Sequence, residues 1–168
     1  KSVCLNVIIS SLLYAKHPSE LKFVFIDPKM VEFSAYASLI KHYLAVLPDA
    51  DHEDSEKSRA IVKNAKDAEK ILRSICIEMD ERYVLLAKAG VNKVTLYNDK
   101  FRDRKLNPEK GHKYLPYLVV VVDEYADLTM STGASPEAKA ASRSITNSII
   151  RLAQKGRAAG IHVILATQ

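Results

Sequence analysis

The chain opens on Lys1 and Ser2, which run directly into an apolar stretch with a helical pattern. A lysine followed by serine or threonine at a helix start forms the last third of the phosphate-binding signature G-x-x-x-x-G-K-[ST]. In that signature the lysine reaches the β- and γ-phosphates, the hydroxyl ligates Mg²⁺, and backbone N–H groups cradle the phosphates. The glycines of the signature are not in this chain, and a Lys-Ser pair alone also occurs commonly by chance.

A second candidate lies in the run VVVVDE, where Asp123 and Glu124 follow four valines. Consecutive β-branched residues predict a strand buried on both faces. Two carboxylates at its end are typical of a Walker B motif, in which aspartate holds Mg²⁺ and glutamate polarises the attacking water. The alternative is a buried strand with solvated acids at its tip. Because Lys1 and Ser2 supply the other half of a magnesium–nucleotide site, we expect the chain to begin inside a phosphate-binding loop.

Two further polar groups stand near the C-terminus. Thr167 and Gln168 follow the final apolar run; in motor ATPases a polar residue at such a strand end contacts the γ-phosphate, although an ordinary strand cap explains the pair equally well. Basic residues in the preceding segment are candidates for contacts with DNA or with a neighbouring subunit: Arg151, Lys155 and Arg157. The alternative is a solvated basic helix face.

The elements that must position these residues alternate along the chain. Strands are predicted at residues 21–27 and 43–47, in the valine run YLVVVVDEYADL of residues 117–128, and in the final run IHVILATQ. Helices are predicted at residues 2–16, 66–89 and 93–104, and in a segment that ends near residue 159. This alternation predicts an α/β fold with a mostly parallel sheet, in which ligands bind at the carboxyl ends of the strands.

Composition narrows the class of protein. With 168 residues, 48% of them hydrophobic, and no apolar run near the ~18 residues of a membrane span, the chain reads as one soluble globular domain. The net charge of +5 is compatible with a polyanionic partner, but the basic residues are scattered. Cys4 and Cys76 are far apart and no secretory signal is present, which favours reduced thiols. The five histidines have no metal-ligand spacing, and the acids of residues 49–56 favour a solvated loop over a cation site because they lack a calcium-loop pattern.

Several segments, in order along nearly the whole chain, resemble the motor domain of the FtsK/SpoIIIE family of DNA translocases. They are the Lys-Ser entry into a helix, FVFIDPKMVEFSAY, EMDERYVLLAKAGVNKVTLYN, LVVVVDEYADL and RLAQKGRAAGIHVILATQ. The resemblance implies a RecA-like P-loop NTPase core, of which residues 1–168 are a partial motor domain that begins inside the Walker A motif. It also implies ATP and Mg²⁺ as cofactors, a homo-hexameric ring, and double-stranded DNA pumped through the central pore at cell division or sporulation.

The resemblance assigns roles to individual residues. Nucleotide binding falls to Lys1, Ser2, Asp123, Thr167 and Gln168, with Ser2 and Asp123 also as Mg²⁺ ligands and Glu124 as the catalytic residue. The family's DPK segment matches Asp27, Pro28 and Lys29, to which no chemical step is assigned. Pore loops are expected near residues 127–135 and around Arg157.

The resemblance also implies parts beyond this chain. A membrane-spanning region, a linker and a DNA-reading winged-helix domain are usual in full-length relatives, so we expect the cytoplasmic domain of a bacterial inner-membrane protein. Without the backbone amides of the complete loop, residues 1–168 alone are expected to bind nucleotide poorly and to be inactive.

Two other functions stay open at this stage. One is a related ring ATPase that serves protein secretion or conjugative DNA transfer, although the segment IDPKMVEF favours the chromosome translocases. The other is an assembly module that keeps the fold without hydrolysing ATP. The intact Lys1, Ser2, Asp123 and Glu124 argue against that module.

Overall fold

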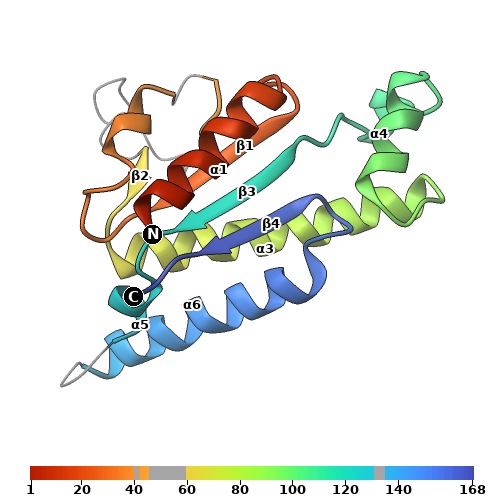
Figure 1. The fold of residues 1–168 in the computed structure, drawn as a ribbon. Helices are drawn as coiled ribbons and strands as arrows, with labels where there is room; N and C mark the ends of the chain where they lie inside the picture. Colours follow the sequence, from red (N-terminus) through yellow and green to blue (C-terminus); the bar gives the residue numbers. More distant parts are fainter. Residues whose placement is uncertain (40–41, 46–59, 131–134) are drawn as a thin grey trace.

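The computed structural model describes residues 1–39, 42–45, 60–130 and 135–168. Four strands form one sheet, β1 (Leu21–Ile26), β2 (Ile61–Val62), β3 (Tyr117–Val122) and β4 (Ile161–Leu165), in the order β2-β1-β3-β4 (Figure 1). Every neighbouring pair in this sheet runs parallel. The predicted α/β fold with a parallel sheet is confirmed.

The two central strands are buried on both faces, which explains their unbroken apolar sequences. β1 and β3 pair over their whole length, from Leu21 opposite Tyr117 to Ile26 opposite Val122. Alternate valines of β3 enter two separate cores: Val120 belongs to one cluster and Val121 to the other. The register therefore brings the residues after Ile26 and Val122 side by side at the carboxyl end of the sheet.

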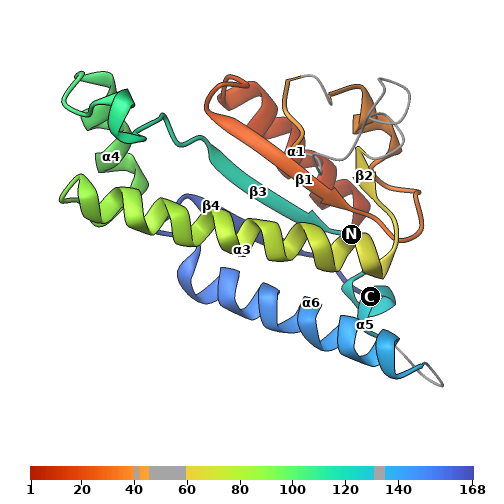
Figure 2. The same cartoon turned by 180° about the vertical axis from the view of Figure 1, so that it is seen from behind.

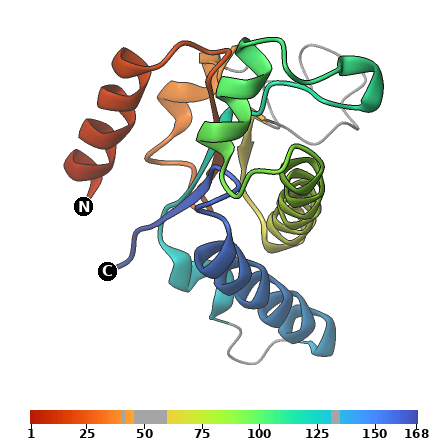
Figure 3. The same cartoon turned by 90° about the vertical axis from the view of Figure 1, so that its right-hand side faces the viewer.

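Helices cover both faces of the sheet (Figure 3). One face is covered by α1 (Ser2–Ala15) together with the 3-10 helix η1 (Ser34–Leu39). The other is covered by α3 (Ala65–Lys88) and α6 (Pro136–Lys155), which lie next to each other in Figure 2. Shorter elements complete the chain: α4 (Val94–Arg102), η2 (Pro108–Lys110) and α5 (Tyr125–Thr129).

Local sequence explains where the two long helices begin. At α3, the side chain of Asn64 accepts a hydrogen bond from the Asp67 backbone N–H at 2.8 Å. At α6, Ser135 caps the Ala138 N–H at 3.3 Å, and Pro136 occupies the first turn, where no N–H is needed. Both helices pack apolar sides on the sheet and on each other; in α3 the apolar residues recur at three- and four-residue steps, the spacing of an amphipathic helix.

Three local predictions differ from the structure. Residues 43–45 form only an isolated bridge, between Leu44 and Phe23, instead of the predicted strand, and residues 46 and 47 lie outside the described residues. β2 was not predicted, because two residues carry no periodic signal. The run 117–128 was predicted as a strand, but β3 ends at Val122 and residues 125–129 form the helix α5, because the left-handed backbone of Glu124 ends the extended conformation. The acidic segment 49–56 lies outside the described residues.

The amino-terminal end of the sheet is held by buried polar contacts. Arg82, which is 4% exposed, donates to the backbone oxygen of Ala159 and to Glu78, both at 2.9 Å. Asn98 exchanges two hydrogen bonds with the backbone of Leu115, at 2.8 and 3.0 Å. These bonds fix the connections that lead into β3 and β4.

Candidate functional site

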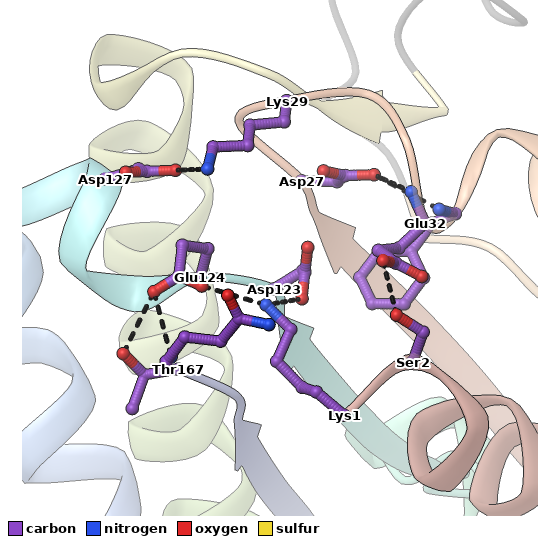
Figure 4. Close-up of polar contacts among 11 residues, drawn as sticks. Lys1, Ser2, Asp27, Lys29, Glu32, Asp123, Glu124, Asp127 and Thr167 are labelled. Atoms are coloured by element: carbon purple, nitrogen blue, oxygen red, sulfur yellow. Dashed lines mark hydrogen bonds and ion pairs between the residues drawn. The ribbon is translucent and has the colours of Figure 1, made fainter.

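Residues from three separate elements meet at the carboxyl edge of the sheet (Figure 4). Lys1 precedes α1, Asp123 and Glu124 follow β3, and Thr167 lies beyond the end of β4. Parallel strands place their carboxyl ends on the same side, which is why segments distant in sequence converge here. The sequence-predicted residues Lys1, Asp123, Glu124 and Thr167 are therefore brought together.

The amino group of Lys1 lies between two carboxylates. Its Nζ atom is 2.8 Å from Oδ1 of Asp123 and 2.9 Å from Oε2 of Glu124. All three side chains are largely shielded from solvent. The hydrogen bond with Asp123, and secondarily the one with Glu124, raises the pKa of Lys1 against the opposing effect of burial. Lys1 is therefore held as a cation at this edge.

Glu124 is the most highly connected residue of the site. Its second oxygen, Oε1, accepts hydrogen bonds from the Thr167 hydroxyl at 3.0 Å and from the Gln168 backbone N–H at 3.2 Å. The hydrogen bond from Lys1, followed by the bond from Gln168, lowers the pKa of Glu124 to about 2. The carboxylate is thus ionised at neutral pH and is suited to orienting a water molecule by accepting its hydrogen bond; it is a weak base while Lys1 stays bound.

The backbone of Glu124 has an unusual conformation. Its φ angle of 51° lies in the left-handed region, which residues other than glycine seldom adopt. Two backbone hydrogen bonds stabilise this conformation. The Tyr125 N–H donates to the backbone oxygen of Ala166 at 3.1 Å, and the Asp127 N–H donates to the backbone oxygen of Glu124 at 3.0 Å. This turn makes the abrupt change from β3 to α5 and directs the Glu124 side chain toward Lys1 and Thr167 (Figure 4). Strained residues of this kind are concentrated at functional sites.

Ser2 forms no hydrogen bond with Asp123, the residue predicted to share a metal ion with it. Its hydroxyl donates to Oε1 of Glu32 at 2.5 Å. Glu32 in turn belongs to a loop held by Asp27, whose Oδ2 accepts the backbone N–H groups of Glu32 at 2.9 Å and of Phe33 at 3.1 Å. Oδ1 of Asp27 is buried and has no partner among the described residues. Sequence reasoning missed Glu32 and gave Asp27 no task; the only available signal was an acid within the DPK segment that follows a buried strand.

The charges at this edge suit a divalent cation bound partly through water. Asp123 and Glu124 contact Lys1, while Glu32 bonds Ser2 and is held in turn by Asp27 (Figure 4). Within the described part of the chain no three acidic, histidine or cysteine side chains are close enough to hold an ion by themselves. Mg²⁺ prefers hard oxygen ligands, keeps several waters and commonly adds substrate phosphates to one or two protein ligands. The oxygen donors and the unpartnered Oδ1 of Asp27 fit such an ion.

Comparison with known proteins decides the family. The FtsK/SpoIIIE family profile matches residues 1–168, the whole chain. The chain belongs to the FtsK/SpoIIIE family. It is 42% identical over 168 residues to the DNA translocase FtsK of Chlorobaculum tepidum, and 43% identical over the same length to that of Streptococcus pyogenes. The alignments include 100% of this chain but only 18% of the length of each relative.

Three solved structures resemble the fold of this chain. The conjugation coupling protein TcpA of pCW3, solved with ATPgS, matches 99% of this chain and 39% of its own, with a TM-score of 0.71 and 26% identity. EssC of Geobacillus thermodenitrificans matches 100% of this chain and 26% of its own chain, with a TM-score of 0.65 and 19% identity. The type VII secretion ATPase EccC of Thermomonospora curvata matches 99% of this chain and 16% of its own chain, with a TM-score of 0.67 and 19% identity. The FtsK/SpoIIIE chain therefore has the α/β core of the RecA-like P-loop ATPases.

The basic candidates lie away from this edge of the FtsK/SpoIIIE chain. Arg151 forms an ion pair with Asp80 of α3, with Nη2 and Oδ1 separated by 2.6 Å. Lys155 and Arg157 line a cleft at the opposite end of the sheet, together with Lys93. No helix in the described ranges is long and apolar enough to cross a membrane.

Proposed function

We propose that this chain is the ATP-hydrolysing core of a motor that translocates double-stranded DNA. The observation that carries the proposal is the Lys1 amino group held between Asp123 and Glu124, with Thr167 on the other oxygen of Glu124. A phosphate-binding lysine, a metal-binding aspartate and a water-orienting glutamate are parts that phosphoanhydride hydrolysis uses, and Thr167 takes the place of a strand-end sensor. Family membership and the relatives named DNA translocase FtsK support the substrate.

The chemistry we propose needs no covalent intermediate. Lys1 leaves its two carboxylates and pairs with the β- and γ-phosphates, which frees Glu124 to accept a hydrogen bond from the attacking water. Mg²⁺ bound by Ser2 and Asp123 would neutralise phosphate charge. Thr167 and Gln168 hold the other Glu124 oxygen, so movement of Glu124 toward or away from the γ-phosphate is passed directly to the end of β4.

We further propose that residues 1–168 are a partial motor domain that starts inside the Walker A motif. Ser2 is the first residue of α1, as a phosphate-binding loop requires, and the curated relatives are several times longer than this chain. β4 lies at the edge of the described sheet, and Val3 and Val7 of α1 are 78% and 59% exposed, which leaves apolar surface for a further strand. Residues 1–168 alone should bind nucleotide poorly, because the loop amides that receive the phosphates lie outside them.

The partners of the motor follow from the same proposal. A pump must pass any sequence, so it should contact mainly the phosphate backbone of DNA, and binding should weaken steeply with salt. We propose a homo-hexameric ring anchored in the bacterial inner membrane by a region outside this chain, with the motor on the cytoplasmic side. Arg151, Lys155 and Arg157 are the candidates for contacts with DNA or with a neighbouring subunit.

An alternative is a related ATPase that serves conjugative DNA transfer or protein secretion. The 26% identity to a conjugation coupling protein favours this as the second candidate. A protein-secretion ATPase would share the hydrolysis chemistry and differ in what is moved, so the response to DNA separates it from a DNA translocase.

The deciding experiment measures ATP hydrolysis by the whole protein with and without double-stranded DNA, together with displacement of a triplex-forming strand from that DNA. We expect DNA to stimulate hydrolysis and the triplex strand to be displaced only with ATP. Hydrolysis indifferent to DNA would transfer the proposal to a protein-moving ATPase. Nucleotide binding without turnover would leave the non-hydrolysing assembly module.

A further inference from the structure

The loop between β1 and η1 is fixed from both ends. Asp27, fully buried, accepts the N–H groups of Glu32 and Phe33 through one oxygen. Phe33, also fully buried, packs on Phe25 of β1 with the ring centroids 5.0 Å apart. Because its own N–H and the next residue are both held, the backbone of Glu32 has a defined place beside the start of α1 (Figure 4).

Glu32 uses that place to receive the single hydroxyl proton of Ser2, at an O–O distance of 2.5 Å. A serine hydroxyl has one proton to donate and two lone pairs, so fixing the proton also fixes the direction of the lone pairs. A cation is bound through a lone pair, which requires the proton to point elsewhere. Asp123 is paired with Lys1 and forms no hydrogen bond with Ser2, so Glu32 is the carboxylate that orients this hydroxyl.

No basic side chain within residues 1–39, 42–45, 60–130 and 135–168 forms an ion pair with Glu32. Among the described residues, its side chain has only the Ser2 hydroxyl as a polar partner and forms no ion pair. The second oxygen of Asp27 is buried and has no hydrogen-bond partner among the residues that the structure describes. A buried carboxylate oxygen without a donor is costly unless a cation or an ordered water completes it. Both features favour positive charge next to Ser2.

We propose that Glu32 is a positioning residue of the cation–nucleotide site: it accepts the Ser2 proton, turns the Ser2 oxygen toward a divalent cation, and is itself held by Asp27. The inference rests on the proposed function and deepens it. It extends the site to a third strand-end loop, which follows β1, in addition to those after β3 and β4.

The test measures Mn²⁺ binding to the whole protein with ADP by electron paramagnetic resonance, and ADP binding without metal in EDTA. Removing an outer partner of a metal ligand typically weakens metal binding about 10- to 100-fold. We expect that loss in Glu32→Ala with metal-free ADP binding unchanged. Glu32→Gln should restore most of the affinity, because its amide oxygen accepts the same proton. The matched control is Glu20→Ala, which removes a carboxylate paired with Arg102 at the amino end of β1 and should change neither quantity.

A double variant separates the positioning role from a general effect on folding. If Glu32 acts through Ser2, then Ser2→Ala with Glu32→Ala should lose no more Mn²⁺ affinity than Ser2→Ala alone. Losses that multiply, or unchanged Mn²⁺ affinity in Glu32→Ala while Ser2→Ala is impaired, would overturn the inference and leave the proposed function intact. Equal loss of metal-free ADP binding in Glu32→Ala would also overturn it, because that indicates damage to the fold. Wild-type protein that binds neither ADP nor Mn²⁺ would contradict the proposed function itself.

Discussion

The buried polar groups at the two ends of the parallel sheet differ in whether they are paired with hydrogen-bonding or charged partners. At the amino end, Arg82 and Asn98 are bonded to backbone atoms of the connections into β4 and β3, and the nearby His112 bonds the Tyr97 hydroxyl at 2.9 Å. At the carboxyl end, the buried polar residues are all acidic: Asp27, Asp123 and Glu124. Only Lys1 neutralises any of them, and one oxygen of Asp27 has no partner in the described structure.

The polar groups at the amino end stabilise the fold, whereas the acidic groups at the carboxyl end are suited to binding a ligand. Polar groups that satisfy one another rigidify a core and specify its packing. Carboxylates placed side by side repel one another, so an arrangement of this kind costs stability unless a cation or phosphate-bound metal completes it. The unfavourable repulsion between carboxylates is therefore concentrated at the proposed site of ATP hydrolysis. Substitutions at the carboxyl end should damage activity much more than stability, while substitutions at the amino end should do the reverse.

The largest effect is expected at the carboxyl end, for Lys1→Ala in the whole protein. The loss of one charged group that stabilises the transition state costs on the order of 10²- to 10³-fold in hydrolysis rate. The control is Lys29→Ala, which breaks an exposed ion pair with Asp127 (3.3 Å) at the same end of the sheet. This substitution should change the hydrolysis rate little. Steady-state ATP hydrolysis measures both, and equal rates in the two variants would remove Lys1 from the mechanism.

The amino end supplies the next effect, for Arg82→Met. The methionine keeps the apolar stem but leaves the backbone oxygen of Ala159 buried without its donor, which should lower the free energy of unfolding by about 2–3 kcal/mol. Arg73→Met on the same helix is matched, since Arg73 also pairs with a glutamate four residues earlier but is 67% exposed, and it should cost less than about 0.5 kcal/mol. Urea denaturation measures both. Loss of ATP turnover in folded Arg82→Met would contradict the division between the two ends.

A smaller effect is expected for Thr167→Val, which removes the hydroxyl bond to Glu124 without changing the shape of the side chain. A hydrogen bond to a charged group contributes about 1.5 kcal/mol or more, so turnover should fall about 10-fold. Thr167→Ser keeps the hydroxyl and should retain most of the activity. If Thr167→Val and Thr167→Ser behave alike, Thr167 is an ordinary strand cap.

The smallest effect is on acid stability. The pKa of Glu124 is about 2 in the folded chain, below its ordinary value of 4.5. A lowered folded-state pKa contributes stability above the unfolded pKa and loses it as pH falls from about 4.5 toward 2. The stability advantage of wild type over Glu124→Gln should therefore be present at pH 6 and shrink by pH 3, as measured by thermal unfolding. A difference that does not change with pH would show that Lys1 does not hold Glu124 ionised.

The sequence was sufficient to predict the residues that follow long, regular elements. The valine run placed Asp123 and Glu124 at the end of a buried strand, and the apolar helix after Ser2 placed Lys1 at its start. Strand alternation alone then predicts that both meet at one edge. The bridging position of Lys1 between the two acids follows from side-chain geometry and had no sequence signal.

The residues that the sequence could not place lie in irregular backbone. Glu32 is in a loop without periodicity, and its bond to Ser2 joins positions 30 residues apart. β2 consists of Ile61 and Val62 alone, which is too short for a pattern. Asp27 was visible as a strand-end acid, but its function as an acceptor for two N–H groups depends on how the next six residues fold back.

The central claim is that Glu124 orients the attacking water while Lys1 and its partners bind the nucleotide. The most direct test is single-turnover hydrolysis of ATP by the whole protein, comparing wild type with Glu124→Gln and measuring ATP affinity in parallel. We predict that Glu124→Gln binds ATP with unchanged or tighter affinity and hydrolyses it at least about 100-fold more slowly. Hydrolysis at the wild-type rate in Glu124→Gln would contradict the account.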